Sequence, residues 1–221
     1  MSQQQRYAYL KRFRLGTPTE VSFGAQASGD LGGTGTDGVS PNWDAQSNLA
    51  TMFGQGMTAT AVQMASIYQT LGNGGVRLPV SLVAGCRAAD GSVTSTPSTP
   101  GTPVVSPAAA RSTVDMLETM ASKGWLANQI AVPGYRLATK TGTAQQPDGK
   151  GGYSSSYLVS LAGLAPADDP QYVVSVSLAD PVKMNTSAAT APIFREVMTQ
   201  VLKSFRVVPS GSSSPDLATN F

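Results

Sequence analysis

Apolar residues recur at helical spacing in two segments of the first third of the chain. The first segment, near the N-terminus, has Tyr7, Leu10 and Phe13 or Arg14 along one stripe. Gly16 follows as a stop signal, so an amphipathic helix is predicted to end just before it. A second helix is predicted over residues 62–71, with Thr58 or Thr60 as its N-cap.

Two more helices are predicted further along. Ser106-Pro107 begins one, because serine is a favourable N-cap and proline suits the first helical position. Gly124 ends this helix, whose predicted apolar face comprises Val114, Leu117, Met120 and Ala121. The last helix follows residue 190 and has a wider apolar stripe, made of Ile193, Phe194, Val197, Met198, Val201, Leu202 and Phe205.

Strand patterns fill the remainder of the second half. "YRLATKTGTA", "YLVSLAGLAP" and "YVVSVSLADP" read as three strands whose short connections predict antiparallel neighbours. A short strand is also predicted at Leu82 and Val83, followed by an exposed Thr-, Pro- and Ser-rich connection over residues 87–106.

These elements predict an α+β fold, an antiparallel sheet covered by a C-terminal helix with a partial helical subdomain. We expect one domain over residues 1–208 and a disordered tail over residues 209–221, where serine and other polar residues dominate.

Composition narrows the classes of function. Hydrophobic residues make up 41% of the 221-residue chain and charged residues 13%, which suits a folded core. The net charge of +2 is too small to indicate nucleic-acid binding. The sequence has no histidine and only one cysteine, Cys86, which excludes histidine-based triads and His- or Cys-cluster metal sites. We expect no metal, no cofactor and a buried Cys86, and no stretch is apolar enough to span a membrane.

Two stretches imitate nucleotide-binding motifs. "GTGTDG" at residues 33–38 fits G-x-G-x-x-G, but Pro41 follows and no helix is predicted there. "GYRLATKT" at residues 134–141 has Thr139 in place of the second P-loop glycine. The residues after Lys140 cannot open the helix that a P-loop requires. We therefore interpret both stretches as turns and strand ends.

Lys140 has two interpretations when its own segment, "TKTGTA", is considered alone. Strand alternation places Lys140 and Gly142 on one face, and Thr141 and Thr143 on the other. A lysine, a glycine and two hydroxyls on an exposed strand edge suit acyl transfer on a peptide, since edge N–H groups bind peptides or stabilise an oxyanion. The alternative is a surface lysine on a polar strand end.

The wider sequence resembles a known family. "KTGT" followed by "GGY", then "LAGLAPADDPQYVVSVSLADP" and "ATAPIFREV", resembles the C-terminal part of the transpeptidase domain of penicillin-binding proteins, class B, cell-division type. "LATMFGQGMTATAVQMASIYQTLGNGG" and "LGTPTEVSFGAQASG" resemble segments upstream of that motif, although Ala61 stands where the family usually has proline. K-T-G alone is a weakly specific motif, whereas the ordered set of these segments is strongly specific for the family. The resemblance runs from about Met1 to Val208.

The resemblance implies roles for the four residues of the motif. Lys140 would help proton transfer and attract the carboxylate of the substrate. Thr141 and Thr143 would hydrogen-bond the carboxylate of a D-alanyl terminus or a β-lactam. Gly142 would let the strand approach the substrate, and the Thr143 backbone N–H would be one oxyanion-hole donor.

The family's other two motifs, S-x-x-K and S-x-N, are not found in this sequence in the expected form. S-x-x-K, which supplies the serine nucleophile, occurs nowhere in the chain. The one S-x-N of interest, Ser40-Pro41-Asn42, is rejected because it follows the first helix, whereas the family's S-x-N precedes it. We therefore expect Met1 to fall just past the true S-x-N, with no nucleophile in this chain.

The expected function is part of a peptidoglycan D,D-transpeptidase that cross-links D-alanyl stem peptides by serine acyl transfer and binds β-lactams when intact. By itself the chain is expected to be inactive. Expected partners are the D-Ala-D-Ala stem peptide, β-lactams, cell-division proteins and the missing N-terminal half of the domain. The resemblance implies the extracytoplasmic face of a bacterial membrane. The alternative is a non-catalytic module of the same ancestry that binds peptides or a division partner.

Overall fold

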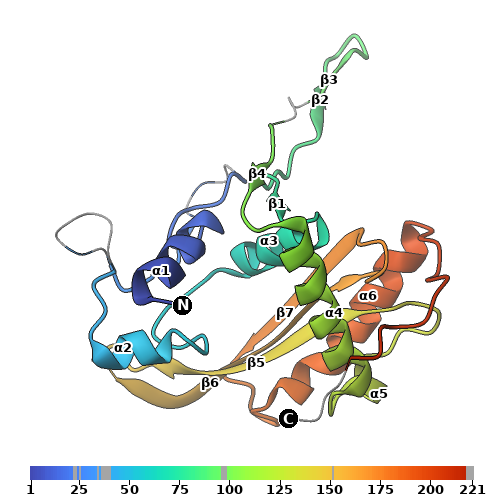
Figure 1. Cartoon of the computed structure of the whole chain (residues 1–221). Helices are drawn as coiled ribbons and strands as arrows, with labels where there is room; N and C mark the ends of the chain where they lie inside the picture. The colour runs from blue at the N-terminus through green and yellow to red at the C-terminus, as the bar shows by residue number, and fades with distance from the viewer. Residues whose placement is uncertain are drawn as a thin grey trace.

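The computed structural model has three layers, with a central sheet between two helical layers (Figure 1). It describes residues 1–217 except 22, 23, 25, 34, 36–40, 96–98 and 151. The elements are α1 (Gln3–Arg12), α2 (Ala45–Ala50), α3 (Ala61–Gly72), β1 (Val76–Arg77), β2 (Gly85–Arg87), β3 (Val93–Ser95), β4 (Thr102–Pro103), α4 (Pro107–Lys123), α5 (Ala127–Ile130), β5 (Ala138–Pro147), β6 (Tyr153–Ala165), β7 (Tyr172–Ala179), the 3-10 helix η1 (Ser187–Thr190) and α6 (Ala191–Ser204).

Local sequence signals explain where the helices begin. Thr60 caps α3 in a capping box with Gln63, each side chain accepting a hydrogen bond from the other residue's backbone N–H. Ser106 caps α4, with Pro107 at the first helical position, as predicted. The chain leaves α1 through Arg14 and Gly16, which adopt positive φ angles of 66° and 74°.

The central sheet has the order β5-β6-β7 and is antiparallel throughout, as the short connections predicted. Ala138 pairs with Leu164 at one end of β5, and the register continues to Ala144 opposite Leu158 before an irregularity near Pro147. In this sheet β5 and β7 are the edge strands.

Each face of the sheet packs against its own helices. On one face, Leu164 and Ala138 form a cluster with Val114 of α4, and Leu71 of α3 packs against it. On the other face, Leu161 joins Phe194, Met198 and Leu202 of α6, all of them fully buried. Burying one side chain of this size contributes about 1.5–3 kcal/mol to folding. These contacts therefore stabilise the packing of α6 against the sheet.

Two predicted apolar faces are narrower than expected. On α4, Met120 is 47% exposed, while Glu118 occupies a buried position instead. On α6, Ile193, Val197 and Phe205 are exposed, because the helix contacts the sheet along one side only. Apolar periodicity thus located both helices but overestimated the width of their buried faces.

The region between α3 and α4 departs from the predicted strand. Leu82 and Val83 lie outside any strand and are exposed, whereas Gly85–Arg87 pairs with Val93–Ser95 in a hairpin. This β2–β3 hairpin projects from the body of the molecule (Figure 1). Cys86 lies on it and is exposed, so its predicted burial was wrong.

Residues 209–217 carry no helix or strand, yet several of them contact the body of the domain. The expected disorder of residues 209–221 and the boundary at residue 208 remain predictions. None of the helices in the described part of the chain is long and apolar enough to cross a membrane.

Candidate functional site

A buried ion pair fixes the segment that leads into β5. The Arg136 guanidinium donates from Nε to Glu118 Oε1 (2.6 Å) and from Nη2 to Glu118 Oε2 (2.8 Å), and Glu118 is 1% exposed. These hydrogen bonds raise the pKa of Arg136 above its ordinary value, despite the opposing effect of its partial burial. Because Arg136 precedes β5 by two residues, the pair ties the beginning of this strand to α4.

The K-T-G-T residues follow along β5 where the helical layer no longer covers it. Ala138 is fully buried beneath α4, whereas Lys140, on the same face by strand alternation, is exposed. Gly142 follows on that face and is half-buried. Thr141 and Thr143 occupy the opposite face, where Thr141 is half-buried and Thr143 is exposed. The structure therefore places Lys140 and Gly142 together, next to the helical layer.

Among the residues that the structure describes, β5 pairs with β6 alone, so its outer side is open there. Lys140 Nζ donates to the Thr141 carbonyl oxygen at 3.0 Å from an exposed position. We infer that this carbonyl faces the open edge. In an antiparallel strand, alternate residues direct both backbone groups away from the partner, so the Thr143 N–H faces the same edge.

Gly142 leaves room for a neighbouring side chain within the sheet. It pairs directly with Ser160 of β6, and a Cβ atom added at residue 142 would lie 2.6 Å from Ser160 Oγ. The serine hydroxyl thus leans over the glycine, on the face that carries Lys140. Sequence reasoning assigned this glycine to substrate approach and missed Ser160, because cross-strand register has no local signal.

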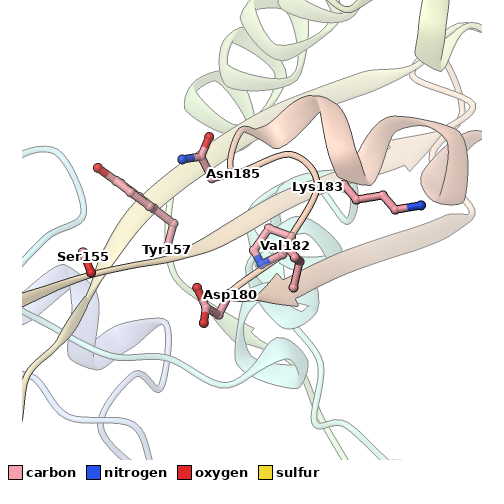
Figure 2. Close-up of a pocket in the computed structure, with 7 residues that line it drawn as sticks. Ser155, Tyr157, Asp180, Val182, Lys183 and Asn185 are labelled. Atoms are coloured by element: carbon pink, nitrogen blue, oxygen red, sulfur yellow. The ribbon is translucent and has the colours of Figure 1, made fainter.

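A polar cavity of about 440 Å³ lies at the ends of β6 and β7 and is lined by Ser155, Tyr157, Asp180, Pro181, Val182, Lys183 and Asn185. In Figure 2, Lys183 points away from Tyr157 and Asn185. Tyr157 pairs with Gln145, so the cavity lies two residues along the sheet from Thr143. Asp180 has a positive φ of 48°, a backbone state that only a few residue types tolerate. None of these residues was predicted from sequence.

A second cavity, of about 1090 Å³, lies along α6 and the segment before it, and shares Pro181, Val182 and Lys183 with the first cavity. Within the described ranges, no three Asp, Glu or Cys side chains gather as a metal site.

The structure tests the prediction for one nucleotide-like motif, but not for the other motif or for the S-x-N sequence. Lys140 lies inside a strand that continues to Pro147, so no helix follows it to hold phosphate, as predicted. Most of the stretch 33–38, and Ser40 of the S-x-N sequence, lie outside the described residues.

Comparison with known proteins supports the resemblance found in the sequence. The sequence profile of the penicillin binding protein transpeptidase domain matches residues 1–199. The chain belongs to this family. Its relatives include penicillin-binding protein PbpB of Mycolicibacterium smegmatis, which is 34% identical over 96% of this chain and 33% of its own length. Peptidoglycan D,D-transpeptidase FtsI of Escherichia coli K12 is 31% identical over 93% of the chain and 32% of FtsI.

Solved transpeptidase structures share the fold. Penicillin-binding protein 3 of Mycobacterium tuberculosis, complexed with ampicillin, matches with a TM-score of 0.80 and 30% identity over 95% of this chain and 47% of that chain. The transpeptidase domain of Burkholderia pseudomallei penicillin-binding protein 3 matches with a TM-score of 0.77 and 26% identity over 96% of this chain and 60% of that one. The α+β transpeptidase fold and the class B, cell-division type are thereby confirmed. The chain spans about a third of the length of the curated relatives it matches.

Proposed function

We propose that this chain supplies the K-T-G wall of a peptidoglycan D,D-transpeptidase site, in which a serine from another segment is the nucleophile. The observation that carries the proposal is the position of Lys140–Thr143 on an open strand edge, within a chain of this family. An extended D-alanyl peptide can add to this edge through backbone hydrogen bonds.

The residues of the wall have distinct tasks. The Lys140 ammonium lies on the face of β5 beside the helical layer, where it assists proton transfer and attracts the peptide carboxylate. The Thr141 and Thr143 hydroxyls bind that carboxylate. The Thr143 N–H donates to the oxyanion that forms when serine attacks the carbonyl, and the second donor is the N–H of the nucleophile.

The proposed ligands, partners and location also follow from membership of this family. Among the similar proteins, FtsI is a peptidoglycan D,D-transpeptidase, and penicillin-binding protein 3 has solved structures with ampicillin and with aztreonam. We propose D-alanyl stem peptides and β-lactams as ligands, cell-division proteins as partners, and the extracytoplasmic face of a bacterial membrane as the location.

Substitution of Lys140 tests this assignment in the full-length transpeptidase that we propose contains this chain. Lys140→Ala should slow acylation by a fluorescent penicillin about 100-fold or more, the range that one positioned acid–base group supplies. Thermal stability should change little, because Lys140 is exposed. Lys150→Ala, at an exposed hairpin position, is the matched control. Unchanged acylation in Lys140→Ala would show that this lysine lies outside the site.

A further inference from the structure

The segment after α6 runs back across the molecule toward the C-terminal end of α4 (Figure 1). We call residues 209–217 the C-terminal strap. Its contacts concentrate on residues 134–136, the turn that leads into β5. The strap lies beyond residue 199, where the match to the family profile ends.

Ser210 is the centre of these contacts. Its hydroxyl accepts a hydrogen bond from the backbone N–H of Arg136 (3.0 Å) and donates one to Asp168 Oδ1 (2.7 Å). Its own N–H donates to the carbonyl of Gly134 (2.9 Å). One half-buried serine therefore makes three hydrogen bonds to two segments that are distant in sequence.

The turn at Gly134 is shaped to receive the strap. Gly134 has a φ of 86°, which L-residues with a side chain rarely adopt. A Cβ atom placed on Gly134 would lie 3.6 Å from Pro209 Cβ, so the strap packs directly over this turn. The glycine that imitates the start of a P-loop in the sequence thus has a structural role here.

The contacts extend from the turn to the anchors of β5. Arg136 also donates from Nη1 to Ser212 Oγ (2.7 Å), while its remaining nitrogens hold Glu118. The Arg136 carbonyl accepts from the N–H of Ala167, which follows the end of β6. The strap therefore contacts Arg136, which joins α4, the beginning of β5 and the segment after β6.

We propose that Ser210 is a positioning residue, which acts through Arg136 to fix where β5 begins and therefore where Lys140 lies. The effect of Ser210 on catalysis rests on the function proposed above. Its contact with Arg136 does not depend on that function. The far end of the strap has a lesser role. Lys123 and Asp216 pair at 2.6 Å, but their side chains are 42% and 92% exposed, and exposed pairs contribute little.

Amide hydrogen exchange of the 221-residue chain, followed by NMR, tests the proposal. Ser210→Ala should speed exchange at least tenfold at Arg136 and Ala138, while Val174 and Val176 of the far strand keep their rates. Ser210→Thr keeps the hydroxyl and should restore protection. Asp216→Asn, which weakens only the exposed pair, is the control and should leave all of these amides unchanged.

A role limited to overall stability gives a different result, because global unfolding speeds exchange by the same factor in β5 and β7. A uniform change, complete loss of the fold, or unchanged exchange at Arg136 in Ser210→Ala would each overturn the proposal. The measurement needs no substrate, so it can succeed even if the proposed transpeptidase function fails.

Discussion

Ser66 lies in the middle of α3, is 3% exposed, and has a hydroxyl without a hydrogen-bond partner among the described residues. An unsatisfied buried hydroxyl costs free energy because it loses its bonds to water. Ser66→Ala should therefore stabilise the chain by about 1 kcal/mol, and helix propensity adds to this gain.

Urea unfolding measures that change. Ser112→Ala, on the exposed side of α4, is the matched control because it improves helix propensity without removing a buried hydroxyl. Equal gains in the two variants would show that the Ser66 hydroxyl is satisfied in solution.

Tyr68, on the same helix, makes stability depend on alkaline pH. Burial raises the pKa of Tyr68 to about 12, because the phenolate is poorly solvated inside the protein. The unfolded chain loses this proton near pH 10, so the contribution to stability is complete below pH 10 and is lost between about 10 and 12.

The slope should approach about 1.4 kcal/mol per pH unit in that window. Urea unfolding at pH 9, 10 and 11 measures it for the unmodified chain and for Tyr68→Phe. The difference between the two removes the contribution of the other tyrosines. Identical slopes would contradict the raised pKa.

At the scale of elements, the Glu118–Arg136 pair joins α4 to β5. Glu118→Ala leaves the Arg136 guanidinium, whose side chain is 10% exposed, without its bidentate partner, which should cost about 3–5 kcal/mol of unfolding free energy. The double variant Glu118→Leu/Arg136→Met should cost less than Glu118→Ala, because it leaves no unpaired charge. Urea unfolding of both variants measures this. A cost below about 1 kcal/mol for Glu118→Ala would show that the pair does not hold the two elements together.

Sequence patterns predicted those elements whose signals are local. The cap at Ser106 came directly from residue type, Thr60 was one of two cap candidates with Thr58, and the three strands came from alternation and turn residues. The Glu118–Arg136 pair was not predictable, because it joins residues 18 apart whose approach depends on helix–sheet packing.

The candidate site shows the same limit. Lys140, Gly142 and their faces followed from strand alternation, whereas Ser160 and Ser210 depend on contacts across the sheet and around the molecule. The burial predicted for Met120 failed because helical spacing gives a direction on the helix but not the extent of the surface that covers it.

On the scale of the whole molecule, the two edges of the sheet have different proposed roles. The open edge of β5 faces the proposed peptide, and β7 carries the other edge, which we propose adjoins the N-terminal half of the domain.

Labelling with a fluorescent penicillin tests most directly whether this chain is one wall of a transpeptidase site. The full-length protein should form a covalent adduct that survives denaturing electrophoresis, with the label on a serine of an S-x-x-K motif. The 221-residue chain should remain unlabelled under the same conditions, because it contains no such motif. A covalent adduct on the 221-residue chain, or none on the full-length protein, would contradict this assignment.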